Sequence, residues 1–189
     1  MPTPNPNALE FLRTRRSRPA KTLTTPVPDR DALYPLLEAA ARSPDHGKLE
    51  PWRFIVLERG ALTRLAEAVP ARAEALGVDG EKMQAQFGTA HLAVAVVSAP
   101  KPSDKIPQVE QAMSAGAVCL ALLNAALAAG WGANWLTGWA AHDAEFVQAN
   151  LGLTQTETIA GFIHIGTETA TPPERPRPDL GAITTWVST

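Results

Sequence analysis

The chain has 189 residues, and 17 Lys and Arg against 19 Asp and Glu give it a formal net charge of −2 at pH 7. This balance, without a long block of like charge, argues against a surface built for nucleic acid or an anionic membrane. Hydrophobic residues make up 45% of the chain and charged residues 19%, which excludes disorder for most of it. We expect one compact domain over residues 1–189.

Cysteine and histidine usage argues against disulfides and metals. The single cysteine, Cys119, cannot form an internal disulfide, and with four scattered histidines it offers no cysteine-rich zinc site. We therefore expect no bound metal, and a reducing compartment with the cytoplasm as the default.

The sequence predicts neither a secretory signal nor a membrane span. Residues 1–7 lack a basic segment followed by an apolar stretch and are expected to form a loose arm. The most apolar stretch, residues 115–131, contains Asn124 and is shorter than the roughly 20 residues needed to cross a bilayer. We expect a soluble protein without a membrane partner.

The spacing of apolar residues predicts four elements in the first half of the chain. They are a short helix containing Leu9, Phe11 and Leu12 with Asn7 as its N-cap, a helix that is capped by Asp29 or Asp31 and stops near Ser43 and Pro44, a strand over 54–57, and a helix containing Leu62, Leu65 and Val69. Arginines end the first helix, and Pro35 must lie in the first turns of the second. Gly77 and Gly80 mark the following turn.

Three strands and two helices are predicted in the second half. The run at 92–97 is apolar without alternation, which indicates a strand buried on both faces between layers of helices. Further strands are expected at 133–136 and 159–165, with a helix at 108–129 and a short one at 144–150. Residues 171–189 are expected to form an extended tail, with polyproline geometry over 171–178. The order of elements is typical of the α+β class.

The segment 108–139 is nearly free of charge. Glu110 is its only formally charged side chain, where the chain average of 19% would give about six. From Ala115 the helix is apolar almost all the way round, so it must be covered on nearly every side. We infer that a second subunit covers part of it. The alternative is a central helix within a monomer.

Common catalytic signatures are missing from the sequence. Gly130-Trp131-Gly132 follows a helix and lacks the third glycine of a dinucleotide fingerprint, and neither a phosphate loop nor a GxSxG elbow is present. His91 and His164 lie at or in apolar strands and are interpreted as structural residues. We therefore assign no catalytic side chain.

Three short motifs offer groups that bind an anionic or aromatic ligand, although each has a plain structural alternative. Arg15, Arg16 and Ser17 can surround a phosphate, or the arginines can stabilise the end of a helix. Residues 42–46 can project an arginine and a histidine into a cleft, or form a capped turn. Residues 135–138 can supply an aromatic wall and backbone N–H groups, or belong to the core.

Taken in order, these motifs resemble the nitroreductase family. Residues 15–17, 42–46, 51–54, 110–116 and 135–138 follow one another as they do in its short bacterial branch of NAD(P)H nitroreductases, and the resemblance spans about residues 8–166. It implies an α+β nitroreductase fold, with a mixed, mainly antiparallel central sheet flanked by helices. It also implies an intertwined homodimer with FMN at the subunit interface.

The resemblance also implies which residues bind the cofactors. Arg15, Arg16 and Ser17 would hold the phosphate and ribityl side of FMN, and Arg42 and His46 would approach the flavin of the other subunit. A later cofactor-binding stretch matches Trp135, Leu136 and Thr137. The segment associated with NADH or NADPH matches Ala125, Ala126, Leu127, Ala128, Ala129 and Gly130.

Three positions depart from the family pattern or extend it. Leu136 stands where the branch often has Arg or Lys, so only backbone contacts are expected there. Glu50 replaces a common glutamine, which can change hydrogen bonding near the cleft. Arg177 can supply a further phosphate contact, or be a solvated residue of the tail.

The implied reaction is hydride transfer from NADH or NADPH to flavin N5, followed by reduction of a nitro compound, quinone or similar small acceptor. Use of one flavin face by both substrates predicts ping-pong kinetics. A cation at the flavin pyrimidine would stabilise the reduced form, and Arg42, Arg15 and Arg16 remain open for that role. The alternatives are a non-catalytic FMN-binding carrier or regulator, and an FMN-free assembly protein.

Overall fold

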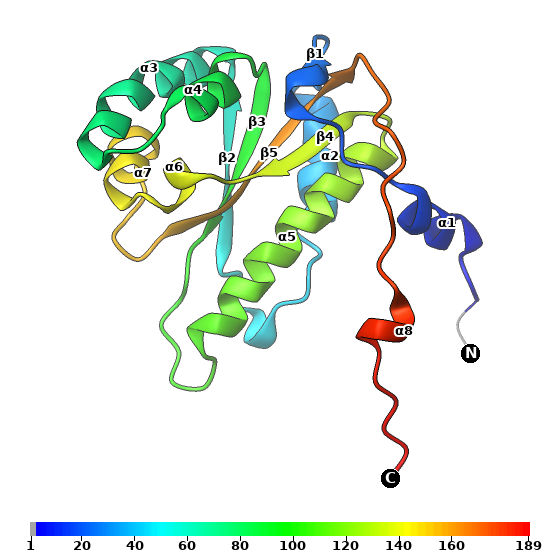
Figure 1. The fold of residues 1–189 in the computed structure, drawn as a ribbon. Helices are drawn as coiled ribbons and strands as arrows, with labels where there is room; N and C mark the ends of the chain where they lie inside the picture. Colours follow the sequence, from blue (N-terminus) through cyan, green and yellow to red (C-terminus); the bar gives the residue numbers. More distant parts are fainter. Residues whose placement is uncertain (1–2) are drawn as a thin grey trace.

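The computed structural model describes residues 3–189 and places a five-stranded sheet between two layers of helices (Figure 1). The strands follow the order β1-β5-β3-β2, β4 pairs with β5 on the side away from β3, and every pairing is antiparallel. They are β1 (Leu23–Thr24), β2 (Trp52–Glu58), β3 (Leu92–Ser98), β4 (Gly132–Leu136) and β5 (Thr158–Glu168). The α+β class is confirmed.

The helices vary from single turns to the 21 residues of α5. They are α1 (Pro6–Thr14), α2 (Arg30–Ala40), α3 (Arg59–Leu76), α4 (Glu81–Gly88), α5 (Gln108–Ala128), α6 (Trp139–His142), α7 (Ala144–Leu151) and α8 (Leu180–Ile183), with 3-10 turns at η1 (Ala20–Thr22) and η2 (His46–Lys48). Asp29 caps α2 by accepting from the Ala32 N–H at 2.9 Å. Asp143 caps α7 in the same way.

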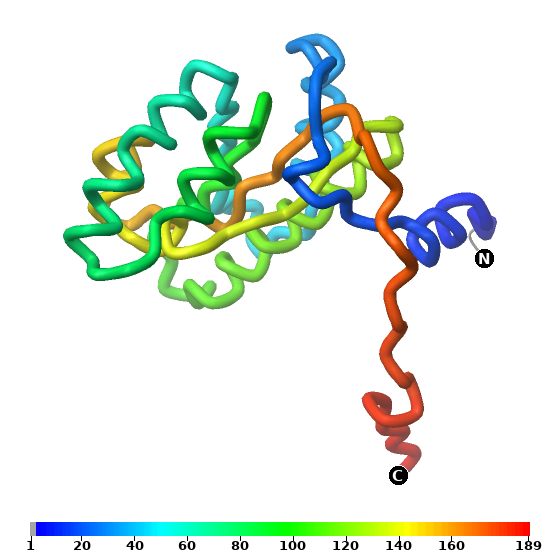
Figure 2. Tube along the Cα trace, turned by 45° about the horizontal axis from the view of Figure 1, so that its top comes forward, coloured from blue at the N-terminus to red at the C-terminus, as the bar shows by residue number. Residues whose placement is uncertain are grey.

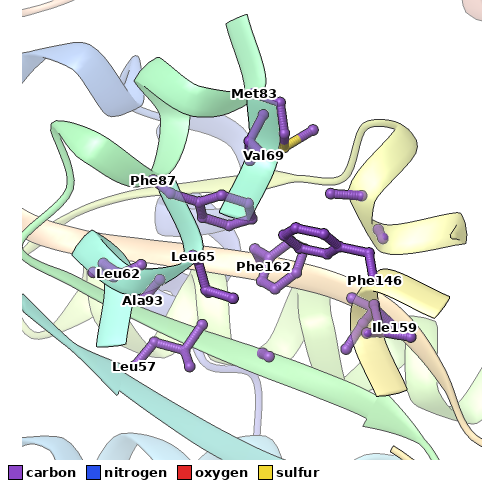
Figure 3. Close-up of a cluster of buried hydrophobic side chains, with 14 of the residues drawn as sticks. Leu57, Leu62, Leu65, Val69, Met83, Phe87, Ala93, Phe146, Ile159 and Phe162 are labelled. Carbon is purple, nitrogen blue, oxygen red and sulfur yellow. The ribbon is translucent and has the colours of Figure 1, made fainter. Parts of the chain in front are cut away.

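Strand β3 is buried along its whole length, as its continuous apolar run predicts. On one face of the sheet, side chains from α3, α4, α6 and α7 form a core in which the rings of Phe87 and Phe162 meet edge to face at 5.3 Å (Figure 3). On the other face, α2 and α5 pack against the sheet. These two layers account for the uncharged strands at the centre of the chain.

Helix α5 is covered on one side only. Val118, Cys119 and Leu122 are fully buried under the sheet, but Met113 is 68% exposed and Leu120 is 46% exposed. Packing within one chain therefore leaves part of this helix open to solvent. By length and composition α5 would also suffice to cross a membrane. Its packing on α2 and the sheet identifies it as a helix of the core.

Both ends of the described chain stand apart from the sheet. Figures 1 and 2 show the segment after β5 leaving the body and running past α1 to a free C-terminus. Trp186 in this tail is 91% exposed, and residues 171–179 form neither helix nor strand. No residue of α1 is buried.

Several predicted boundaries need correction. The N-cap of α1 is Asn5, whose side chain accepts from the Ala8 N–H, and not Asn7. Residues 6 and 7 of the predicted loose arm are therefore helical, while residues 1–2 lie outside the described part of the chain. Helix α3 begins at Arg59 directly after β2 and includes Gly60. The short elements β1, α4, α6 and α8 were not predicted, because so few residues carry no clear periodicity.

His164 is a titratable residue buried in β5. It is 1% exposed, and neither ring nitrogen has a hydrogen-bond partner within residues 3–189. Burial lowers the pKa of His164 to about 4, because the charged form would lose its hydration. The interpretation of this histidine as a structural residue agrees with its place in the core.

The buried imidazole predicts acid sensitivity. As pH falls below 6.5, the unfolded chain binds a proton at His164 and the folded chain does not until about pH 4. This difference should lower the free energy of unfolding by about 2 kcal/mol between pH 8 and pH 5. Urea unfolding at both pH values should show that the free energy of unfolding falls less in His164→Leu than in the unchanged protein. The exposed His142→Gln serves as the control, and an equal loss in all three proteins would contradict the assignment.

Candidate functional site

The arginine stretch after α1 is held in place by β4. The Arg18 N–H donates to the Ala133 carbonyl at 2.8 Å, and the Asn134 side-chain amide donates to the Arg18 carbonyl at 2.8 Å. These two bonds fasten the backbone of residues 15–18 beside the sheet. The sequence offered no sign of the role of Asn134, because its partner lies more than one hundred residues earlier.

Arg15 and Arg16 present guanidinium groups that the protein does not satisfy. One Arg15 nitrogen donates to Ser17 Oγ at 2.9 Å, but the buried Arg15 Nε and Arg16 Nη1 have no hydrogen-bond partner in the described residues. Burial lowers the pKa of Arg15, and the charges of three nearby arginines lower it further, namely Arg177, Arg16 and Arg18. A partly buried cluster of positive charge with unused donors is suited to binding an anion.

Carboxylates from β5 and the tail partly neutralise this cluster. Glu168 pairs with Arg18. Glu174 lies 3.5 Å from Arg16 Nη1, a distance that makes an ion pair without hydrogen-bond geometry, and 2.8 Å from Arg177 Nη2. The tail thus brings Arg177 into the cluster together with its own counter-ion. The positive charge still exceeds the negative.

A hollow of about 210 Å³ joins the arginines to the end of α5. Leu127 and Gly130 line it together with Phe11 and Trp131. The structure therefore brings together two predicted groups, residues 15–16 and part of 125–130. Within that second group Ala126 is fully buried in the core, whereas Ala128 and Ala129 are exposed and Ala125 is half-buried.

The predicted stretch at the end of β4 is partly accessible. Trp135, Leu136 and Thr137 are half-buried. The Trp135 indole N–H donates to the Ala160 carbonyl at 3.3 Å, and the ring lies so close to Gly161 that any Cβ there would collide with it. Trp135 is thus fixed in orientation by β5, which fits a rigid wall beside a ligand.

Arg42 and His46 lie at the other end of α5. Arg42 is exposed after α2, and His46 lines a hollow of about 420 Å³ that includes Glu110 and Met113 from the start of α5. Glu110 and Leu127 are 17 residues apart on one helix, which is roughly 25 Å at 1.5 Å per residue. One copy of the chain therefore does not unite these residues with the arginine cluster.

Comparison with known proteins identifies the family to which this architecture belongs. The family model described as "Nitroreductase family" matches residues 12–167. The chain belongs to the nitroreductase family. The resemblance seen in the ordered motifs is thereby confirmed.

Relatives of this nitroreductase cover most of its length. It is 34% identical over 164 residues to "Putative NAD(P)H nitroreductase YdjA" of Escherichia coli (strain K12), an alignment that covers 85% of this chain and 88% of the relative. The "Nitroreductase-like Family Protein" of Bacillus cereus matches with a TM-score of 0.79 at 22% identity, over 99% of this chain and 98% of the other.

A structure of a nitroreductase from Desulfovibrio desulfuricans in complex with FMN shares the same fold. It matches with a TM-score of 0.75 at 23% identity, over 99% of each chain. Together with the Bacillus cereus protein it confirms the nitroreductase-like fold expected from the sequence. The arginine cluster and the residues around β4 are therefore described within a family fold, on this chain's own geometry.

The tail carboxylate predicts a measurable effect on anion binding. Glu174→Gln removes negative charge beside Arg16 and Arg177, so we expect inorganic phosphate to bind the flavin-free protein a few-fold more tightly. Isothermal titration calorimetry at low ionic strength would measure this. Glu67→Gln, on the exposed side of α3, provides the same change of charge elsewhere. Equal phosphate affinity in all three proteins would show that Glu174 does not act on the cluster.

Proposed function

We propose that this chain is an FMN-dependent oxidoreductase that takes hydride from NADH or NADPH and reduces a small acceptor such as a nitro compound or a quinone. The observation that carries the proposal is the partly buried arginine cluster with unused donors. Support comes from a relative named for NAD(P)H and from a structural neighbour solved with FMN.

The described residues fit the phosphate of FMN. A phosphate dianion supplies acceptor oxygens for Arg15 Nε and Arg16 Nη1, which have no hydrogen-bond partner in the described residues. It also relieves the repulsion that lowers the pKa of Arg15. Ser17 and Arg177 stand beside the same site. This set provides more positive charge than the carboxylates of Glu168 and Glu174 neutralise.

We propose that the working form is an intertwined homodimer. The uncovered face of α5 carries Val109, Met113 and Leu120, and the tail exposes Leu180, Ile183, Trp186 and Val187. A second copy would remove both apolar surfaces from water. If the two α5 helices run antiparallel, residues 42–46 of one copy meet the arginine cluster of its partner, and the divided site becomes whole.

Within that dimer each group of residues has a distinct task. Arg15, Arg16 and Ser17 bind the phosphate, while Trp135, Leu136 and Thr137 form a wall fixed by β5. Residues 125–130 are the proposed contact for the nicotinamide nucleotide. Of these, Leu127 and Gly130 line the hollow that the nucleotide would enter. FMN, when bound, accepts hydride and passes two electrons onward. Arg15, Arg16 and Arg42 remain candidates for stabilising its reduced form.

The reaction is proposed to follow ping-pong kinetics, because reductant and acceptor would use one flavin face in turn. The chain is further proposed to act as one domain over 1–189, with 171–189 reaching toward the partner copy. We place the reaction in the cytoplasm. The rival function is that of an FMN-binding carrier or regulator with little turnover.

Anaerobic titration separates these functions. Purified protein reconstituted with FMN should be yellow, and NADH or NADPH, tested in parallel, should bleach the flavin absorbance. Subsequent addition of a quinone should restore the absorbance. Flavin that binds but is not reduced would favour the carrier, and failure to retain flavin would contradict the proposed function.

The phosphate site has its own test. Arg16→Ala should weaken FMN retention by about 1.5 to 3 kcal/mol, the contribution of a hydrogen bond to a charged group. Riboflavin, which lacks the phosphate, should bind the variant and the unchanged protein almost equally. Fluorescence titration of the flavin-free proteins would measure both ligands. Unchanged FMN affinity would remove Arg16 from the phosphate site.

A further inference from the structure

The loop that carries His46 adopts an unfavourable backbone. Gly47 has a φ of 73°, Lys48 a φ of 56° and Glu50 a φ of 48°. Left-handed geometry suits glycine, but for residues with a side chain it costs about 1 to 2 kcal/mol each. A segment that holds two such residues within three positions needs strong contacts to keep it in shape.

Those contacts come from both ends of the loop and from α5. Asp45 accepts from the Glu50 N–H at 2.7 Å, which closes the loop on itself. Ser114 on α5 donates to the Pro44 carbonyl at 2.7 Å and accepts from the Trp52 indole at 3.2 Å. The loop is therefore fastened to α5 and to the start of β2, and the position of His46 is defined.

His46 meets a single acidic partner. Its Nδ1 lies 2.6 Å from Glu110 Oε2. An ionised carboxylate can only accept a hydrogen bond, so this contact places the proton on Nδ1 and leaves Nε2 as the nitrogen that exchanges a proton. Glu110 is the one charged side chain in residues 108–139. A charge kept in such a segment, and directed at a histidine, calls for a chemical role.

The pair borders a hollow at the start of α5. The hollow of about 420 Å³ beside His46 is bounded by Met113 and Ala117 on the uncovered face of α5. In the proposed dimer this face meets the partner copy, and the hollow opens toward the flavin that the partner would bind. Its lining combines the apolar side chains of Pro44, Met113 and Ala117 with the polar ones of Asp45, His46, Glu110 and Ser114, a mixture that suits a planar aromatic molecule with polar substituents.

We propose that His46 delivers the proton that accompanies hydride transfer to a quinone acceptor, and that Glu110 is the positioning residue that sets the imidazole for this task. The inference rests on the proposed function. Quinone reduction consumes one hydride and one proton and yields a hydroquinone. NAD(P)H supplies the two electrons through the flavin, the proton leaves His46 Nε2 for a quinone oxygen, and water returns a proton to the imidazole.

The roles of the two residues differ physically. Glu110 orients the imidazole through its contact with Nδ1, in the way that a carboxylate orients a catalytic histidine, whereas His46 carries the proton that is delivered. Glu110→Gln keeps the size and an acceptor oxygen but removes the charge. His46→Asn removes the transferable proton altogether.

The experiment compares two oxidants of the reduced, FMN-loaded protein in stopped flow. A quinone requires a proton, whereas ferricyanide accepts single electrons without one. We expect the ratio of quinone to ferricyanide reoxidation rates to fall about 100-fold in His46→Asn, the lower end of the range for general acid catalysis. In Glu110→Gln, which keeps the proton donor, we expect a fall of about ten-fold. The exposed Glu38→Gln on α2 should keep the ratio of the unchanged protein.

A second measurement does not depend on the flavin. Nitrogen-15 NMR of the flavin-free protein should show a His46 Nδ1–H signal shifted by its carboxylate partner, and Glu110→Gln should change it. Equal rate ratios in all variants, or a His46 signal that ignores Glu110→Gln, would overturn the inference. Protein that is not reduced by NAD(P)H at all would instead contradict the proposed function, so the two failures are distinguishable.

Discussion

The unequal covering of α5 governs the organisation of this nitroreductase. One side of the helix fills the core beneath the sheet through Val118 and Leu122, while Met113 and Leu120 on another side remain open to solvent. Covering a helix so poor in charge is favourable, by roughly 25 cal/mol for each Å² of apolar surface removed from water. The candidate site is divided between its two ends, so the surface that favours pairing is also the surface that would complete the site.

At the end of α5, positive charge is concentrated by segments far apart in the sequence. Residues 15–18 are tied to β4, Glu168 belongs to β5, and the tail adds Glu174 and Arg177. Burial of Arg15 among like charges is unfavourable without an anion, as the lowered pKa of its guanidinium indicates. The fold thus leaves an excess of positive charge near β4, where β5 fixes the orientation of the Trp135 ring.

At the start of α5 the chemistry is of another kind. A strained loop, fastened by Asp45 and Ser114, holds His46 against Glu110. The proposed anion binding at one end and the proposed proton delivery at the other suit a protein whose cofactor performs the electron transfer, because the chain then has only to place charges and exclude water.

Much of the architecture followed from the sequence. The apolar run of β3, the capped helix α2 and the long α5 are local patterns, in which each residue's spacing to its near neighbours predicts the element. The ordered motifs also identified the family and predicted Arg15, Arg16 and His46 as site residues, although no single motif did so. Short elements such as α4 and α6 were not predicted, because the conformation of their few residues depends on the core that they cover.

By itself, then, the sequence determined the secondary-structure pattern, the absence of charge along α5 and the family. Only the tertiary structure showed that Asn134 binds the backbone of the arginine stretch, that Glu174 pairs with Arg16, and that Glu110 contacts His46. The physical reason is range. Periodicity and capping act over a few residues, whereas these contacts join residues between 64 and 158 positions apart and exist only after the sheet and α5 have packed together.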